Sequence, residues 1–338
     1  MKSKLFPLII IFAVIACQIP ALATPTAIPS PIPTSTNTDV PTQTATLAPT
    51  TTLTETPTLT PTSAPHATRV LILSIDGLRP DAIALAPMPN LLTLMQNSAY
   101  TLSAQTILPS VTLISHTSML TGLCPSKHGV DWNDYLPENG FAIGTDLFDI
   151  AHANGLQTVM YVGKYKLRQI TEPASTDIFE SVDDSDPLVL TEGLLTDFPQ
   201  DFGVLFIHFA APDDIGHEYG WMSPEQLSVI ARADDALGQI LAELDARSLR
   251  DETLLIVTAD HGGHDSSHGT DLPEDMTIPW IASGPGIQPK LLTTQVHTMD
   301  TAATAAMLLG LPIPLEWDGV PVYEAFGLPI IEKSTACP

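Results

Sequence analysis

Short apolar runs rich in β-branched residues alternate with helical patterns along most of this chain, and this alternation constrains the fold more than any other feature. A strand that is buried on both faces of a parallel sheet has such a run, and an amphipathic segment between two strands indicates a crossover helix. The predicted strands are 70–75, 157–162, 203–209, 253–258 and 278–282, and the predicted helices are 90–97, 112–120, 145–153, 224–247 and 299–309. This order predicts an α/β fold, a doubly wound and mostly parallel sheet with helices on both faces. The last strand contains Pro279 and is expected at an edge of the sheet.

The amino-terminal segment differs from the rest of the chain in composition. Lys2 and Lys4 precede an apolar run, 5–16, which is too short for a transmembrane helix and is typical of a signal peptide. The sequence around Cys17 is similar to a bacterial lipobox, which would place a lipid on that cysteine, whereas 21–23 suits an ordinary signal peptidase; both interpretations remain open. We therefore expect an exported protein with a signal peptide over 1–23, either secreted or held at the cell surface, where a lipid on Cys17 would be its membrane contact.

Residues 24–66 are rich in threonine and proline and contain almost no charge, so they cannot bury enough apolar surface to fold and are expected to form an extended linker. The remaining 67–338 are enough for one domain with a sizeable core. The formal net charge of -25 would repel a phosphate-rich polymer, so no nucleic-acid-binding surface is expected. Cys124 and Cys337 lie in this domain and could pair or stay free in an oxidising compartment.

Side chains that can bind a metal follow three of the predicted strands, at the carboxyl ends where open α/β sheets bind their ligands. Asp213 and His217 are four residues apart, so one helical turn could direct both at the same ion. Asp260 and His261 are adjacent and can share an ion only if the chain turns there, which the two following glycines allow. The candidate ligands are Asp76, Asp213, His217, Asp260, His261 and His268.

This mixture of imidazoles and carboxylates suits Zn²⁺ or another transition metal such as Mn²⁺, because Ca²⁺ and Mg²⁺ prefer shells made only of oxygen. Thr112 begins a predicted helix, where backbone amides and the helix dipole favour an alkoxide and hold an anionic substrate. Taken singly, Thr112 and Asp76 could each be an ordinary helix cap. As a set, these residues predict a metallohydrolase.

At these positions the chain resembles the alkaline phosphatase superfamily, most closely its type I phosphodiesterase/nucleotide pyrophosphatase branch. The family has a nucleophilic threonine followed by Thr-Gly and Pro-x-x-His-Gly, then Pro-Asp-x-x-Gly-His, Asp-His-Gly and His-Gly-x-Asp. The matching positions are Thr112, 121–122, 125–129, 212–217, 260–262 and 268–271. The resemblance implies an alkaline-phosphatase-like fold for the catalytic domain, 67–338. It also implies hydrolysis of phosphodiester or pyrophosphate bonds in a small phosphate ester.

The resemblance further implies two Zn²⁺ ions and a role for each residue. Asp213, His217 and His268 would hold one ion, and Asp76, Asp260, His261 and the Thr112 oxygen would hold the other. Thr112 would be the nucleophile and would form a covalent phosphothreonine. Asn133 lies at the spacing from Thr112 where this branch has its phosphate-binding asparagine.

The chain also departs from the family pattern. Residues 113–116 read Leu-Ile-Ser-His where the branch has Phe-Pro-Asn-His, and His268 follows Asp260 so closely that the long insert of larger relatives is absent. Nucleotide specificity is therefore not expected from the sequence. Trp132, Tyr135 and Trp221 could stack on a base, although packing at the rim of the site explains each of them more simply.

Three other functions remain to be compared with this one. A sulfatase is disfavoured because its Cys or Ser position is occupied by Thr112, with no arginine following. A phosphomonoesterase is the closest alternative and needs an additional cation, for which Arg79, Lys127, Lys164 and Arg168 are candidates, although each alone suits a solvated surface. A tethered binding module on an inactive hydrolase scaffold would have lost ligands, whereas every expected type is present.

Overall fold

The computed structural model describes residues 66–182, 186–331 and 337, all within the compact unit Pro61–Pro338. The predicted signal peptide, Cys17 and nearly all of the predicted linker lie outside these residues. No helix in the described part of the chain is long and apolar enough to cross a membrane.

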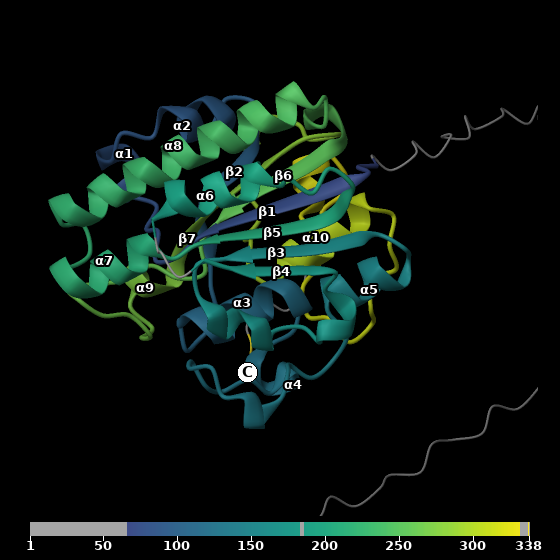
Figure 1. The fold of residues 1–338 in the computed structure, drawn as a ribbon, viewed down its shortest axis with the longest axis horizontal. Helices are drawn as coiled ribbons and strands as arrows, with labels where there is room; N and C mark the ends of the chain where they lie inside the picture. The colour runs from purple at the N-terminus through teal and green to yellow at the C-terminus, as the bar shows by residue number, and fades with distance from the viewer. Residues whose placement is uncertain (1–65, 183–185, 332–336, 338) are drawn as a thin grey trace, which may run out of the picture. The chain divides into compact units, whose positions relative to one another are not determined.

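One eight-stranded sheet, in the order β4-β3-β5-β1-β6-β7-β2-β8, organises the domain (Figure 1). Its strands are β1 Arg69–Ile75, β2 Ala99–Gln105, β3 Gln157–Val162, β4 Ile178–Ser181, β5 Phe202–Phe209, β6 Thr253–Thr258, β7 Thr277–Ser283 and β8 Lys290–Leu291. β1 pairs in parallel with β5 on one side and with β6 on the other. Only β7 runs against its neighbours, so the sheet is mostly parallel, as the sequence predicts. Every residue of β5 and β6 is buried, in agreement with their continuous apolar runs.

Helices cover both faces of the sheet (Figure 1). The α-helices are α1 Ala82–Leu85, α2 Pro89–Met95, α3 Thr112–Thr121, α4 Pro125–His128, α5 Leu147–Ala153, α6 Pro187–Thr196, α7 Ala211–Tyr219, α8 Pro224–Ala246, α9 Pro273–Met276 and α10 Asp300–Leu308. The 3-10 helices are η1 Pro137–Asn139, η2 Tyr165–Gln169, η3 Pro173–Ser175, η4 Arg250–Glu252 and η5 Tyr323–Phe326. The long helix α8 contacts α1, α2, α6 and α7 on one face, and α3 contacts α4, α5 and α10 on the other. This two-sided arrangement confirms the predicted doubly wound class.

The strand that contains Pro279 is not at an edge, so that prediction is wrong. β7 lies between β6 and β2. Proline lacks the N–H that a ladder needs, and the register of β2 against β7 shifts between Thr101 and Ala104, opposite this part of β7. The Pro279 carbonyl accepts a hydrogen bond from Thr258 Oγ1 at 2.8 Å. The irregularity in β2 therefore lets an interior strand contain a proline.

The two cysteines of the domain form a disulfide, Cys124–Cys337, which resolves the alternatives left by the sequence. The bond joins residues that are 213 positions apart. It ties the carboxyl-terminal end of the chain to the residue before α4, close to the carboxyl end of α3. The disulfide agrees with the oxidising compartment expected of an exported protein.

Candidate active site

Three carboxylates meet at the carboxyl edge of the sheet because the three central strands are neighbours. Asp76 directly follows β1, Asp213 lies in the first turn of α7 after β5, and Asp260 follows β6. All three are buried, with exposed fractions of 0%, 2% and 0%. The order β5-β1-β6 therefore brings together ligands that are far apart in the sequence.

One group of ligand atoms surrounds Asp213. His217 and His268 each place Nε2 3.5 Å from Asp213 Oδ1, and the two Nε2 atoms are 3.1 Å apart. Asp213 and His217 come from the same turn of α7, as their spacing predicts. These three residues can hold a metal ion, since their ligand atoms all lie within 4.8 Å of one another.

A second group surrounds His261. Its Nε2 lies 3.3 Å from Asp76 Oδ1 and 3.3 Å from Asp260 Oδ2. Ligand atoms of Asp76, Asp213 and His261 also lie within 4.8 Å of one another, so Asp213 is close to both groups. β6 ends at Thr258 and the chain bends at Asp260, as the shared use of Asp260 and His261 requires. Gly262 has no room for a side chain, because an added Cβ would lie 2.1 Å from the Glu274 carbonyl oxygen.

The carboxylates leave atoms free where metal ions would bind. Asp76 Oδ1, Asp213 Oδ1 and Asp260 Oδ2 are buried and have no hydrogen-bond partner among the described residues. Buried polar atoms are almost always satisfied, so three unsatisfied carboxylate oxygens facing histidine Nε2 atoms form a site suited to a cation. Two groups of nitrogen and oxygen ligands fit Zn²⁺ or a similar transition metal.

Lys164 binds the outer oxygens of two of these carboxylates. Its Nζ donates to Asp76 Oδ2 at 2.7 Å and to Asp213 Oδ2 at 2.5 Å, and the side chain is only 15% exposed. Lys164 thus uses the oxygens opposite those that face His217, His261 and His268. Burial alone would raise the pKa of Asp76, but Lys164 and His208 outweigh it and hold that pKa well below its usual range. Burial, together with the charges of Asp76 and Asp213, raises the pKa of Asp260.

Two further buried histidines, His208 and His116, lie next to the candidate metal ligands and the strand and helix that hold them. His208, on β5, lies with Nε2 3.0 Å from Asp76 Oδ2, and His116 lies with Nε2 2.8 Å from Ser74 Oγ. His116 Nδ1 donates to the Thr112 carbonyl at 2.8 Å, and so connects β1 to the first turn of α3. Burial lowers the pKa of both histidines, which favours their neutral forms. Sequence reasoning missed His208, although a histidine within an apolar strand was a visible signal.

Thr112 is the first residue of α3 and lies beside the second ligand group. Its Oγ1 is 3.5 Å from His261 Nε2, and the residue is 1% exposed. The structure therefore places this hydroxyl where the sequence predicts it, at a helix amino terminus and next to a metal-binding cluster.

Asn133 lies against the same helix end. Its Oδ1 accepts hydrogen bonds from Leu113 N at 2.9 Å and from Lys166 Nζ at 3.1 Å. Both partners can only donate, so the orientation of the amide is fixed and Nδ2 points away from them. Burial and the nearby Lys164 charge lower the pKa of Lys166. Lys166 was not among the cations considered from the sequence, because nothing in its local pattern distinguishes it from a surface lysine.

The other three candidate cations make no ion pair with Asp76, Asp213 or Asp260. Arg79 pairs with Asp81, Lys127 pairs with Asp318, and Arg168 stacks over the Phe179 ring. Of the four cations proposed from the sequence, Lys164 enters the site, and the expectation that it is solvated is wrong.

The aromatic residues mostly have packing roles. Trp221 is 8% exposed and its Nε1 donates to the Gly77 carbonyl, which confirms the packing interpretation. Trp132 packs partly buried against the core. Tyr135 is 41% exposed, and its ring meets that of Tyr165 edge-on at 4.8 Å.

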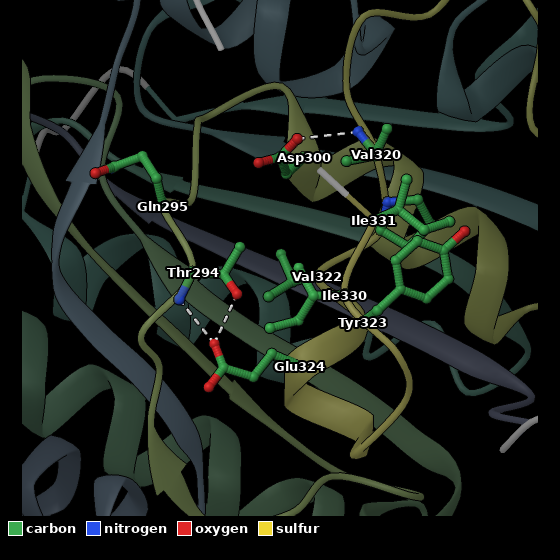
Figure 2. A pocket seen from close by; sticks show the side chains of 10 residues that line it. Thr294, Gln295, Asp300, Val320, Val322, Tyr323, Glu324, Ile330 and Ile331 are labelled. Carbon is green, nitrogen blue, oxygen red and sulfur yellow. Dashed lines mark hydrogen bonds between the residues drawn. The ribbon is translucent and has the colours of Figure 1, made fainter. Parts of the chain in front are cut away.

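A separate pocket of about 290 Å³ lies near the carboxyl-terminal end of the described chain (Figure 2). Its lining includes Val320, Val322, Ile330 and Ile331, and Glu324 hydrogen-bonds Thr294 within it. None of the predicted site residues lines this pocket. The candidate chemistry is therefore at the carboxyl edge of the sheet.

Comparison with known proteins agrees with this geometry. Residues 70–288 match the family model of type I phosphodiesterase/nucleotide pyrophosphatase, and the chain belongs to that family. A venom phosphodiesterase of Crotalus durissus collilineatus is 29% identical over 217 residues, which cover 57% of this chain and 26% of that protein. Ectonucleotide pyrophosphatase/phosphodiesterase family member 5 of Homo sapiens is 26% identical over 214 residues, covering 57% of this chain and 44% of that protein. The chain thus spans less than half the length of these two relatives.

Solved structures show the same fold. An inactive form of murine ectonucleotide pyrophosphatase/phosphodiesterase 5 in complex with AMP has a TM-score of 0.63 at 18% identity, covering 73% of this chain and 96% of that one. A phosphonate monoester hydrolase from Silicibacter pomeroyi has a TM-score of 0.61 at 16% identity, covering 78% of this chain and 77% of that one. These likenesses confirm the predicted alkaline-phosphatase-like fold.

Proposed function

We propose that this chain hydrolyses phosphodiester or pyrophosphate bonds in small phosphate esters, with Thr112 as the nucleophile and two bound Zn²⁺ ions. The observation that carries the proposal is the position of Thr112 Oγ1, 3.5 Å from His261 Nε2 and beside three carboxylates whose free oxygens face histidines. Family membership supports the reaction class, and the AMP bound to the murine structure supports a small phosphate ester as ligand.

The residues would divide between two ions as their contacts suggest. Asp213, His217 and His268 would hold one, and Asp76, Asp260, His261 and the Thr112 oxygen would hold the other. When bound, the ions would supply charge neutralisation at the phosphoryl oxygens and would lower the pKa of a hydroxyl beside them.

The chain's own residues provide the remaining steps. Thr112 Oγ1 attacks phosphorus in line with the leaving oxygen, and the P–O bond to the leaving alcohol or phosphate breaks. Asn133 Nδ2, which Leu113 and Lys166 hold in one orientation, donates to a non-bridging oxygen during this transfer. Water then displaces the Thr112 oxygen from phosphorus, which releases a phosphate monoester or phosphate and restores the hydroxyl.

Export of the protein is part of the proposal. The Lys2 and Lys4 run with its apolar core, the threonine-rich and proline-rich linker, and the disulfide Cys124–Cys337 all support it. Relatives named as venom phosphodiesterases and as an ectonucleotide pyrophosphatase/phosphodiesterase support it as well. Whether Cys17 has a lipid anchor can be determined from the mass of the amino-terminal peptide of the exported chain.

Turnover of bis-p-nitrophenyl phosphate by the zinc-loaded full chain tests the activity. Replacing Thr112 with alanine should lower kcat by about 10³-fold or more, because removing a nucleophile costs most of the catalysed rate. The conservative Thr112→Ser change keeps a hydroxyl and should retain measurable turnover. Undiminished turnover by a folded Thr112→Ala variant would exclude Thr112 as the nucleophile.

A further inference from the structure

Asp275 is a buried carboxylate that the proposed mechanism does not use. Its side chain is 0% exposed, and both of its oxygens accept hydrogen bonds from one loop. Oδ1 accepts from His264 Nδ1 at 2.7 Å, and Oδ2 accepts from the Thr270 backbone N at 2.9 Å and from Thr270 Oγ1 at 2.7 Å. Burial alone would raise the pKa of Asp275, but the bonds from His264 and Thr270 outweigh it and lower that pKa. Asp275 is therefore an ionised acceptor for three donors of the loop.

The backbone of Asp275 holds the same loop at its other end. Its carbonyl accepts a hydrogen bond from Gly262 N at 2.8 Å. Gly262 directly follows His261, and Thr270 lies two residues after His268. These two histidines belong to different ligand groups, so one residue of α9 holds the loop next to a ligand of each proposed metal ion.

The loop presents the two histidines in a fixed orientation. Their rings stack with centroids 3.8 Å apart and planes inclined by 14°. His261 Nδ1 donates to the Gly262 carbonyl at 2.8 Å, and His268 Nδ1 donates to the Ser110 carbonyl at 2.8 Å. A carbonyl can only accept, so each Nδ1 has the proton and each Nε2 is the nitrogen that can bind a metal. A displacement of this loop would therefore move one ligand of each proposed ion.

Thr270 also connects Asp275 to the segment before Thr112. Ser110 Oγ donates to the Thr270 carbonyl at 2.9 Å, and the Ser110 carbonyl accepts from His268 Nδ1. Ser110 lies two residues before Thr112 in the sequence. The hydrogen bonds that begin at Asp275 thus fix His268 relative to the segment that contains the proposed nucleophile.

We propose that Asp275 is a positioning residue that holds His261 and His268 in place for two metal ions, and that the Zn²⁺ affinity of both sites depends on it. Within the described part of the chain, the Asp275 side chain makes no hydrogen bond or ion pair with a proposed ligand side chain. It therefore acts through the loop and touches neither metal nor substrate. This inference rests on the proposed ligand sets and adds a residue that lies outside them.

The test measures Zn²⁺ binding to the metal-free full chain by calorimetry. Loss of residues that orient metal ligands typically lowers metal affinity by about 10- to 100-fold, so both Kd values should rise about 10-fold or more in Asp275→Ala. Asp275→Asn should stay within about 3-fold of the wild type, because its amide oxygen still accepts from Thr270 and its amide nitrogen can donate to a neutral His264. The two variants separate the loss of hydrogen bonds from the loss of charge.

Glu324→Ala is the matched control, since Glu324 is another buried carboxylate that holds a loop. It accepts from the backbone N and hydroxyl groups of Thr293 and Thr294 and pairs with Lys290, at the separate pocket (Figure 2). Its loss should lower the midpoint of urea unfolding in EDTA and leave both Zn²⁺ Kd values unchanged. Asp275→Ala should lower that midpoint too, but of these two variants only Asp275→Ala should weaken zinc binding.

Three results would overturn the inference. The first is a folded Asp275→Ala variant with both Kd values of the wild type. The second is equal weakening in Asp275→Asn, because charge rather than hydrogen bonding would then set the affinity. The third is equal weakening in Glu324→Ala, because the effect would then follow from lost stability alone.

A further variant keeps the inference testable if Asp275→Ala does not fold. Thr270→Val loses only the hydroxyl bond to Asp275 and should raise the Kd of the site that contains His268 by about 3-fold or more, whereas an unchanged Kd would refute the inference. A wild-type chain that binds fewer than two Zn²⁺ ions would instead refute the ligand sets of the proposed function. Two ions bound equally well by the wild type and by Asp275→Ala would refute this inference alone.

Discussion

Replacement of Lys164 by methionine should destabilise the metal-free protein strongly. Lys164 is the cation that pairs with the buried Asp76 and Asp213, whose side chains are 0% and 3% exposed. Methionine keeps most of the length of the side chain and removes its charge and its hydrogen bonds. The buried carboxylates of Asp76 and Asp213 would then lie near each other and near Asp260 without a compensating ammonium.

The size of the effect follows from this burial. Removing one partner of a buried ion pair typically costs about 3–5 kcal/mol, because the remaining charge stays desolvated. With a urea m-value of roughly 3 kcal/mol/M, the unfolding midpoint should fall by about 1 M or more. Bound Zn²⁺ would offset part of the loss, since a cation on Asp76 Oδ1 and Asp213 Oδ1 neutralises the same carboxylates from the other side.

Urea unfolding followed by tryptophan fluorescence, in EDTA and in excess Zn²⁺, measures both effects with the disulfide intact. Lys127→Met is the control: Lys127 is 48% exposed and pairs with Asp318 at the surface, so its loss should cost about 1 kcal/mol or less. Equal midpoints for Lys164→Met and the wild type in EDTA would refute the reasoning. A midpoint difference that Zn²⁺ leaves unchanged would contradict the placement of metal ions on the opposite carboxylate oxygens.

Three further predictions concern the metal, the pH dependence and the turn after His261. His268→Ala should remove one of the two expected zinc equivalents, measured by atomic absorption after gel filtration, while retention of both would exclude His268 as a ligand. Burial alone would raise the pKa of Glu324, but Lys290 and the backbone amides of two threonines lower it from 4.5 to about 2. Because the folded pKa lies below the unfolded one, this stabilisation is present above about pH 4.5 and is lost as the pH falls toward 2. The Glu324→Gln variant should therefore lack about 3 kcal/mol of the unfolding free energy that the wild type loses in acid. Urea titrations that give both proteins the same pH profile would contradict this prediction. Gly262→Ala places a methyl group against the Glu274 carbonyl and should lower the free energy of unfolding by about 1–3 kcal/mol, whereas an unchanged thermal midpoint by circular dichroism would show that the turn can relax.

The sequence predicted those parts of the fold in which burial and pattern agree. β3 and β6 match the predicted bounds, because both are runs of apolar residues that the sheet buries. β2, with small and polar residues in Ala99–Gln105, lacks that pattern and was missed, as were the short strands β4 and β8. α6 was missed as well, and only the Asp213 to His217 turn of α7 was anticipated. The interior position of β7 depends on an irregularity in its neighbour, which no property of β7 itself reveals.

The residues of the candidate site likewise divide into those that the sequence predicts and those that it does not. Asp76, Asp213 and Asp260 follow strands, so topology alone predicts that they meet. Lys164 directly precedes the 3-10 helix η2 and Lys166 lies within it, and their directions depend on how this segment packs against Asn133 and the carboxylates. Residues that reach a site through tertiary packing have no local signal in the sequence.

Mass spectrometry of the peptide that contains Thr112 tests the central claim most directly. The zinc-loaded full chain would be mixed with bis-p-nitrophenyl phosphate, quenched in acid during turnover and digested. The account predicts that this peptide gains the mass of a p-nitrophenyl phosphoryl group on Thr112, and that Thr112→Ala shows neither the adduct nor turnover. Turnover by the wild type with no adduct on Thr112, and with Thr112→Ala equally active, would contradict it.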